Sequence, residues 1–393
     1  MTALASGEQE TSRNEDERIG DLLTQRAGHT TPWFSFEFYP PKTPEGVEKL
    51  YERLAKMAPY NPLFVDFTWG AGGSTAELTL ELTIEARRRF GLLANMHLTC
   101  TNMPTEKVTE ALAKAKEAGI TNILALRGDP PLGQERWEPV EGGFCSALDL
   151  VTYIRKNYGT FFSVGVAGYP EGHPNRISQV GGLEGLSEAE RGRVAVEREE
   201  DGTVTGFYVC KDQDFAQEIQ YLKQKVEAGA DFVITQMFFD SEVYVAFVEA
   251  CHAAGIHVPI IPGIMCVNTV GGFRRMVSFC HTRVPDQLWK EMMSLPKDDE
   301  EAVRKYGTAF GVRLSQELLL AGASGLHYYC LNLSRVALGI VTGLGLGPQS
   351  ADTPPHRVEK VDEKPIKSLV NGADKEEKEK DLDGELVGAV ASS

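Results

Sequence analysis

The feature that most constrains the fold is a regular alternation of short apolar runs with amphipathic stretches of helical periodicity. One helical stretch places Phe215, Ile219, Leu222 and Val226 on a single face, and Gly229 follows as its expected C-cap. Eight runs rich in β-branched and aromatic residues have the length of strands. They are 33–39, 63–69, 94–100, 122–128, 162–169, 231–239, 258–264 and 325–331. Strands separated by helices predict right-handed βαβ crossovers and a mainly parallel sheet.

Both a doubly wound open sheet and a closed (β/α)8 barrel fit this count of strands, and two observations favour the barrel. No GxGxxG motif follows the first run, and GLGLGP at 343–348 comes after the last run, where we interpret it as a turn. Polar residues stand near the C-terminal ends of most runs, and a barrel gathers those ends into one mouth. These residues are Glu37, Thr68, His97, Arg127, Asp129, Tyr169 and Gln236. The predicted fold class is therefore α/β, a (β/α)8 TIM barrel.

Two polar extensions flank the predicted barrel, which spans 31–346. Residues 1–30 are polar and acidic, and residues 347–393 contain no Phe, Tyr or Trp. Such segments bury too little apolar surface to offset the entropy lost on ordering, so we expect a disordered N-terminal extension and a disordered acidic C-terminal tail. Within the barrel, the polar and Gly-rich residues 174–213 are expected to be a surface insertion.

The overall composition excludes several classes of protein. A net charge of −16 argues against binding to nucleic acid or to an anionic membrane. No apolar run is long enough to span a bilayer, and the N-terminus lacks the features of a targeting peptide. The seven cysteines contain no CxxC pair and no tight Cys/His cluster, which predicts reduced thiols, no metal site and a cytoplasmic protein. The sequence is compatible with a homo-oligomer but does not determine the oligomeric state.

The strongest candidate for an active-site acid is Glu37, in the run FSFEFYPPK. A carboxylate among Phe36, Phe38 and Tyr39 would be partly desolvated, which raises its pKa and suits it to proton donation. The same sequence is compatible with an acid at the end of a strand that reaches water or pairs with a lysine.

Weaker candidates follow the other runs, and each also has a purely structural interpretation. Arg127, Gly128 and Asp129 form an RGD sequence that is often a simple turn, and GYPEGHP, which holds Tyr169 and His173, is also typical of a turn. His97 is compatible with an ordinary core histidine. No Ser–His–Asp arrangement is evident, so the combination favours redox chemistry carried by a cofactor over hydrolysis.

Eight motifs, taken in order, resemble the methylenetetrahydrofolate reductase family from about residue 33 to residue 345. They are FEFYPPKTPEG, DFTWGAGGST, HLTC, ALRGDPP, VAGYPEGHP, KVEAGADFVITQMFFD, IIPGIM and GLHYYCLN. The resemblance implies a (β/α)8 domain that binds FAD without a Rossmann fold. It also implies that NADPH or NADH reduces the flavin, and that methylenetetrahydrofolate then takes the hydride and becomes methyltetrahydrofolate. This is a ping-pong scheme in one-carbon and methionine metabolism.

The resemblance also implies residue roles. Glu37 matches the family's general acid, Asp129 matches the acid that hydrogen-bonds the pterin beside the flavin, and Gln236 matches the amide that contacts folate and nicotinamide. The remaining matches are flavin contacts: Thr68, His97, Arg127, Gly128, Ala167, Tyr169, His173 and Lys225, with Glu218 where the family often has an aspartate near the ribose. Lys225 and His173 would offset the phosphate charge in a chain of net charge −16.

The sequence departs from the family pattern at several positions. Ser146 stands where the family often has tyrosine, and Leu333 where many members have arginine, with Arg335 two residues further on. Gly272 and Met276 replace a glutamine and a phenylalanine of some bacterial members. Two alternatives therefore stay open: a related FAD barrel with another substrate, and a non-catalytic paralogue that binds flavin or folate. Eukaryotic members usually continue into a domain that binds S-adenosylmethionine, whereas this chain continues into the acidic tail, so we expect no inhibition by that ligand.

Overall fold

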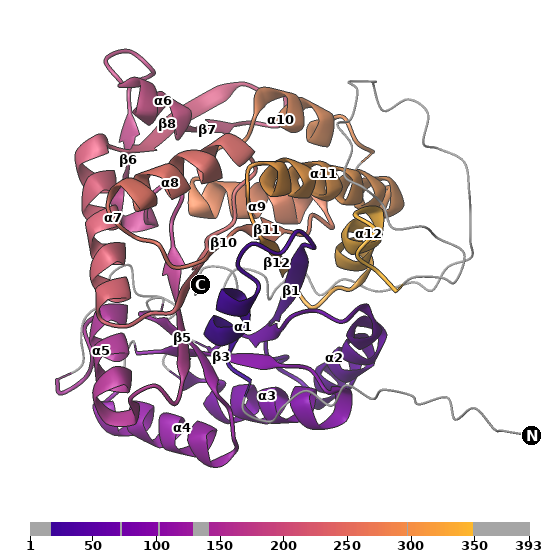
Figure 1. The fold of residues 1–393 in the computed structure, drawn as a ribbon. Coiled ribbons are helices and arrows are strands. Elements are labelled where there is room, and N and C mark those ends of the chain that lie inside the picture. Colours follow the sequence, from indigo (N-terminus) through magenta and orange to yellow (C-terminus); the bar gives the residue numbers. More distant parts are fainter. Residues whose placement is uncertain (1–16, 71–72, 101–102, 129–140, 297, 349–393) are drawn as a thin grey trace, which may run out of the picture.

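A closed ring of parallel strands forms the centre of the molecule (Figure 1). The computed structural model describes residues 17–70, 73–100, 103–128, 141–296 and 298–348. The strands of the ring are β1 (Trp33–Phe38), β2 (Val65–Phe67), β3 (Ala94–Thr99), β4 (Asn122–Leu126), β5 (Ser163–Gly168), β9 (Phe232–Thr235), β10 (Ile260–Ile261), β11 (Gly263–Met265) and β12 (Gly325–Tyr329). All eight runs expected from the sequence contain one of these strands, which confirms the predicted α/β barrel.

The ring closes through a divided strand. The order of the sheet is β10-β9-β5-β4-β3-β2-β1-β12-β11, and only Pro262 separates β10 from β11. Proline has no N–H to donate to a sheet, so the strand is interrupted there. β10 pairs with β9 and β11 pairs with β12, and the Pro262 carbonyl still accepts a hydrogen bond from His327 N at 3.0 Å. The nine segments therefore make eight strand positions around one barrel.

Helices lie on the outside of the barrel between successive strands (Figure 1). They are α2 (Pro44–Met57), α3 (Ala76–Phe90), α4 (Thr105–Glu117), α5 (Ala147–Tyr158), α7 (Asp212–Glu227), α8 (Ser241–Ala253), α9 (Val270–Cys280), α10 (Asp286–Met293), α11 (Glu300–Leu320) and α12 (Arg335–Gly343), with short 3-10 turns η1 (Ala58–Tyr60) and η3 (Pro174–Arg176). Local sequence sets several of their ends. Thr43 caps α2 by accepting from Gly46 N, and α3 ends at Gly91, whose φ of 63° places it in the left-handed region that favours glycine.

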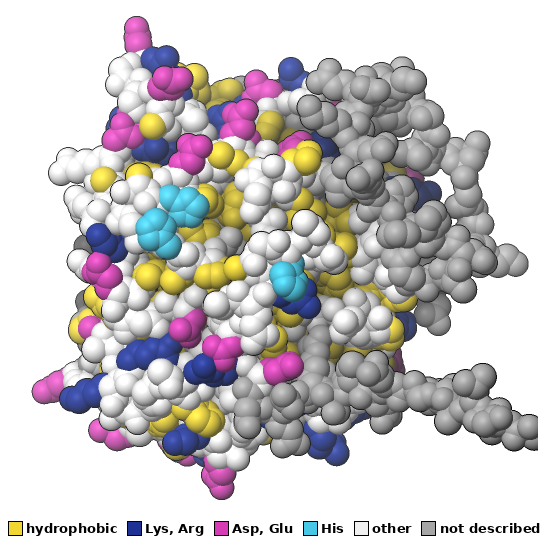
Figure 2. Space-filling model, viewed as in Figure 1, with side chains coloured by type: hydrophobic (Ala, Val, Ile, Leu, Met, Phe, Trp, Pro, Cys, Tyr) yellow, Lys and Arg dark blue, Asp and Glu magenta, His cyan; other side chains and the backbone are white. Residues whose placement is uncertain are grey.

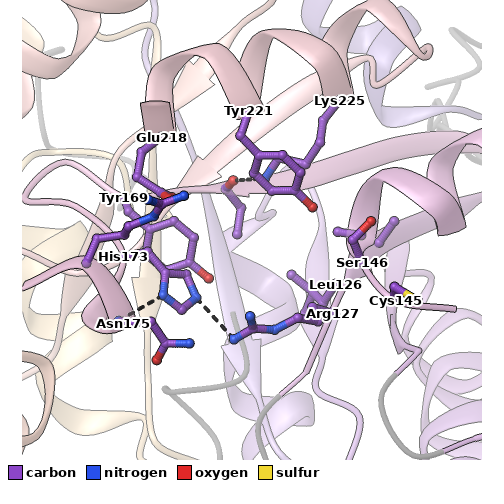
Figure 3. A pocket seen from close by; sticks show the side chains of 14 residues that line it. Leu126, Arg127, Cys145, Ser146, Tyr169, His173, Asn175, Glu218, Tyr221 and Lys225 are labelled. Carbon is purple, nitrogen blue, oxygen red and sulfur yellow. Dashed lines mark hydrogen bonds and ion pairs between the residues drawn. The ribbon is translucent and has the colours of Figure 1, made fainter. Parts of the chain in front are cut away.

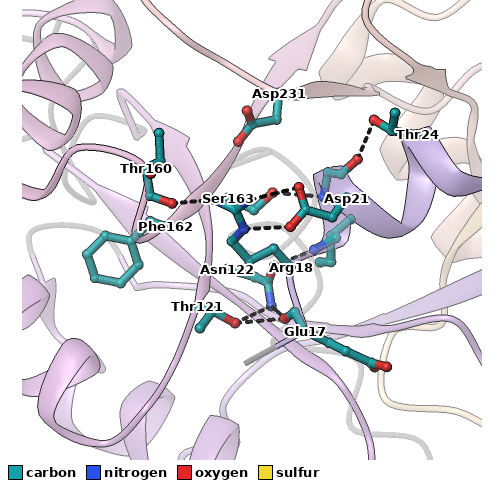
Figure 4. A network of polar contacts seen from close by, with 12 residues as sticks. Glu17, Arg18, Asp21, Thr24, Thr121, Asn122, Thr160, Phe162, Ser163 and Asp231 are labelled. Atoms are coloured by element: carbon teal, nitrogen blue, oxygen red, sulfur yellow. Dashed lines mark hydrogen bonds and ion pairs between the residues drawn. The ribbon is translucent and has the colours of Figure 1, made fainter. Parts of the chain in front are cut away.

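A short helix closes the N-terminal end of the barrel, in a segment that we expected to be disordered. α1 (Ile19–Gln25) buries Ile19 and Leu23 against the apolar core at the N-terminal end of the barrel. No side chain of its own caps it. Its first amides donate instead to the barrel, from Ile19 N to Asn122 Oδ1 at 2.7 Å and from Gly20 N to Ser163 Oγ at 2.9 Å (Figure 4). The expected N-terminal extension is therefore helical from Ile19 to Gln25. Residues 1–16, and the tail from 349, lie outside the described residues.

The expected surface insertion folds into a small sheet of its own. β6 (Ile177–Val180), β8 (Val204–Cys210) and β7 (Ala195–Arg198) pair antiparallel in the order β6-β8-β7, with α6 (Glu188–Gly192) before β7. Leu186, Val194 and Val209 form its apolar centre. Tyr208 stacks on His281, which follows α9, at 4.2 Å between ring centroids, so the insertion packs against the barrel's outer helices.

The distribution of charged side chains on the surface and the state of the cysteines agree with the expectations from the composition. Figure 2 shows acidic and basic side chains interspersed on the visible face, without an extended basic area among the coloured residues. The seven cysteines all fall among the described residues and are free thiols, as expected. Within the part of the chain that the structure describes, no helix has both the length and the hydropathy needed to cross a membrane.

Candidate active site

Glu37 lies inside the barrel and is 4% exposed. The side chains of β1 alternate across the wall, so Phe36 and Phe38 point outward, where they belong to the same core cluster as Leu50 and Leu54 of α2. The prediction that Glu37 is desolvated is confirmed. The aromatic neighbours in the sequence are not the cause, however, because the barrel interior removes the water.

Three further ionisable side chains converge on Glu37 inside the barrel. Asp66 of β2 is its register partner, His97 comes from β3 and His327 from β12, and all three are 0% exposed. His327 Nε2 lies 3.4 Å from Glu37 Oε2 and 3.7 Å from Asp66 Oδ2. His97 Nε2 lies 3.5 Å from each of the same two oxygens. We call these four side chains the acid cluster.

The acid cluster holds four ionisable side chains but few hydrogen bonds. Ser35 Oγ and His327 Nδ1 are 2.8 Å apart, which orients that ring. Among the described residues, neither oxygen of Asp66 and neither ring nitrogen of His97 has a partner that meets hydrogen-bond geometry. Burial by itself lowers the pKa of His97, but the carboxylates of Glu37 and Asp66 outweigh it and raise that pKa above its ordinary value.

A separate cavity of about 350 Å³ opens at the C-terminal ends of β4 and β5 (Figure 3). Of the residues expected to contact flavin, Arg127, Ala167, Tyr169, His173, Glu218 and Lys225 line it. Ser146 lines it too, and its side chain caps α5 by accepting from Asp149 N. Several other lining residues were not anticipated from the sequence, among them Arg176 and Tyr221.

The cavity carries a positive electrostatic field. Burial, and then the positive charges of Arg127, Lys225 and Arg176, lower the pKa of His173 to about 3, so its ring is neutral at physiological pH. Burial also lowers the pKa of Lys225 to about 8, and its Nζ donates to the Ala167 carbonyl at 2.7 Å. The acidic Glu218 is paired with Arg176 at 3.1 Å. A cavity with this charge and with two tyrosines on its wall suits a ligand that is anionic and aromatic.

The remaining predicted residues lie near the barrel mouth or beyond the described residues. Thr68 is buried just after β2, and Gly128 has a φ of 89°, a conformation that favours glycine. Gln236 is 7% exposed just after β9, and its Oε1 accepts from Met237 N at 2.9 Å. Asp129 lies outside the described residues.

Sequence reasoning missed Asp66 and His327, although both stood in runs predicted to be strands. Asp66 precedes Thr68 by two positions and therefore points to the same side of its strand. The alternation of side chains between the two faces of a strand was the signal that could have identified Asp66. His327 had the same signal in GLHYYCL, two residues before Tyr329.

The chain resembles known proteins over most of its length. Residues 22–345 match the family described as methylenetetrahydrofolate reductase. Methylenetetrahydrofolate reductase (NADH) 1 of Zea mays is 44% identical over 85% of this chain and 51% of its own. Methylenetetrahydrofolate reductase 2 of Saccharomyces cerevisiae is 39% identical over 86% of this chain and 51% of its own. The 5,10-methylenetetrahydrofolate reductase of Pectobacterium carotovorum is 31% identical over 86% of this chain and 98% of its own. The chain thus spans about half the length of the plant and fungal relatives and matches nearly the whole bacterial one.

Proposed function

Because the chain belongs to the methylenetetrahydrofolate reductase family, we propose that it reduces 5,10-methylenetetrahydrofolate to 5-methyltetrahydrofolate with FAD and NADH or NADPH. The observation that carries the proposal is the pairing of a buried acid, Glu37, with a cationic cavity in one barrel. Glu37 comes from β1, across the ring from β4 and β5, whose ends form the cavity.

The cavity fits the chemistry of FAD. Lys225 and Arg127 offer positive charge to a diphosphate, and neutral His173 can donate or accept a hydrogen bond without adding a like charge. Tyr169 offers an aromatic face to a planar ring. Bound there, FAD would carry the hydride from nicotinamide to folate in two successive half-reactions. Thr68, His97, Gly128 and Glu218 are proposed as further contacts.

Glu37 would supply the proton. Reduction of methylenetetrahydrofolate consumes one proton in addition to the hydride, and opening of its five-membered ring requires that a ring nitrogen be protonated. The proton would pass from the carboxyl group of Glu37 to that nitrogen. Gln236, whose amide both donates and accepts, is proposed to hold the folate and nicotinamide rings in turn, and Asp129 to hydrogen-bond the pterin.

A two-step spectroscopic experiment tests this function. The purified chain is reconstituted with FAD, reduced anaerobically with NADH or NADPH, and mixed with methylenetetrahydrofolate while the flavin absorbance is followed. Reduction followed by reoxidation is expected, and comparison of the two nicotinamides ranks them as donors. A colourless protein would refute the flavin site. Reduction by nicotinamide without reoxidation by folate would instead indicate another acceptor.

A further inference from the structure

Asp66 and His327 are buried ionisable groups that the proposed function leaves without a role. Together with Glu37 and His97 they place two carboxyl groups and two imidazoles in a space where every side chain is between 0% and 4% exposed. Two ionised carboxylates without counter-charge would be very unfavourable in such an interior. The cluster is electrically neutral when it holds one proton on a carboxyl group and one extra proton on an imidazole.

The geometry suits proton exchange within the cluster. Each of the two Nε2 atoms lies within 3.4 to 3.7 Å of both Glu37 Oε2 and Asp66 Oδ2, so each imidazole bridges the two carboxyl groups. The Ser35 hydroxyl at 2.8 Å from Nδ1 leaves His327 Nε2 directed at the carboxylates. The contact of 3.4 Å between His327 Nε2 and Glu37 Oε2 is a long hydrogen bond. A shift of a few tenths of an ångström would bring the other three contacts to hydrogen-bond length.

Apolar side chains at the N-terminal end of the barrel separate the acid cluster from solvent on that side. The His327 ring stacks on Phe64, with 6.1 Å between centroids, and Phe64 belongs to the apolar cluster that α1 closes. Other described titratable groups near Glu37 come from the β12 side of the barrel. Tyr329 donates its hydroxyl to the Thr235 carbonyl. Burial raises the pKa of the Cys330 thiol well above its usual range, so that thiol stays neutral.

We propose that Asp66, His97 and His327 form a proton store that returns a proton to Glu37 after each reduction of folate. The inference rests on the proposed function. Asp66 and His327 are positioning residues in this scheme, because they act on the substrate only through Glu37.

The proposed steps balance in protons. Glu37 gives its proton to a folate nitrogen and becomes a carboxylate. An Nε2–H bond of the protonated imidazole then breaks as the proton passes to Glu37 Oε2, leaving neutral imidazoles beside ionised Asp66. One proton from solvent, entering at the barrel mouth, restores the store in each turnover. Asp66 makes this cycle possible because its carboxyl group lies 3.5 Å from His97 Nε2 and helps to raise the pKa of His97, which holds the extra proton in the cluster.

The variant Asp66→Asn tests the store, since it removes the charge and keeps the shape. Reduction of the flavin by nicotinamide should be unchanged. In the pH profile of reoxidation by methylenetetrahydrofolate, the fall in rate at high pH should begin at least one pH unit lower than in the wild type. The reoxidation rate should therefore be about tenfold lower than wild type at pH values above this limb and should recover at lower pH. Asp298→Asn, at an exposed position, is the matched control. An unmoved limb, or an equal loss at every pH, would overturn the proposal.

Infrared spectroscopy of the substrate-free wild type separates this proposal from the proposed function and does not depend on the folding of Asp66→Asn. A carbonyl band of a protonated carboxylic acid is expected at neutral pH, and Glu37→Gln should remove it. The same band should weaken in Asp66→Asn. Absence of the band would overturn the store even if folate is reduced. The ligand atoms of Glu37, Asp66 and His327 lie within 4.8 Å of one another, close enough to hold a metal ion. Tight binding of Zn²⁺ by the wild type, lost in Asp66→Asn, would therefore overturn the store as well. If folate does not reoxidise the flavin but the band is present, the proposed function fails and the proton-sharing cluster stands.

Discussion

Replacing Glu37 by glutamine removes a single transferable proton from the centre of the barrel and keeps the size of the side chain. Because Glu37 is 4% exposed, solvent has little access to replace the lost acid. General acid catalysis contributes roughly 10² to 10⁴ in rate, which corresponds to about 3 to 5 kcal/mol in the barrier. We expect the upper part of this range for the folate half-reaction.

The assay follows flavin absorbance in a stopped-flow instrument, with each half-reaction measured separately. Glu37→Gln should bind FAD and be reduced by nicotinamide at the wild-type rate, since hydride transfer to the flavin does not require this proton. Glu48→Gln, at an exposed position on α2, loses the same charge and should match the wild type in both half-reactions. Reoxidation of the reduced Glu37→Gln variant by folate at an unchanged rate would refute the assignment of Glu37 as the acid.

Three predictions concern the scaffold. Lys225→Met should stabilise the apoprotein below pH 8 by up to about 3 kcal/mol, because burial lowers the Lys225 pKa from 10.5 to about 8. The wild type recovers this cost as pH rises from 8 to 10.5, so urea unfolding at pH 7 and pH 10 should show a shrinking difference; a constant difference would contradict the argument. Gly263→Ala would place a Cβ 2.3 Å from the Thr235 carbonyl oxygen and should cost roughly 1 to 3 kcal/mol in unfolding free energy, measured by the same urea unfolding; an unchanged free energy would contradict this. Ile19→Ala should cost about 2 to 5 kcal/mol in the same measurement, whereas Leu320→Ala, at a side chain 64% exposed, should change it by less than about 0.5 kcal/mol; equal effects would mean that α1 contributes little to stability.

Much of the fold follows from patterns that are local in the sequence. The alternation of apolar runs and helical stripes located every strand of the barrel, because side-chain periodicity reports which face of an element is buried. Polar residues at the ends of those runs identified Arg127, Tyr169 and His173, which the structure brings together with Lys225 in one cavity. The roles of these residues stay predictions until the flavin experiment is done.

Tertiary structure decided what depends on contacts between distant segments. The seven-residue helix α1 is too short to be stable alone, and it exists because Asn122 and Ser163 cap it and the barrel floor buries Ile19. Closure of the ring brought His327 to Glu37 across 290 residues of sequence, a proximity that no local pattern encodes. The sequence alone determined that Glu37 is an acid in an apolar strand. The barrel determined which way it points and that Asp66, His97 and His327 surround it, because burial in a closed sheet is set by the pairing of strands.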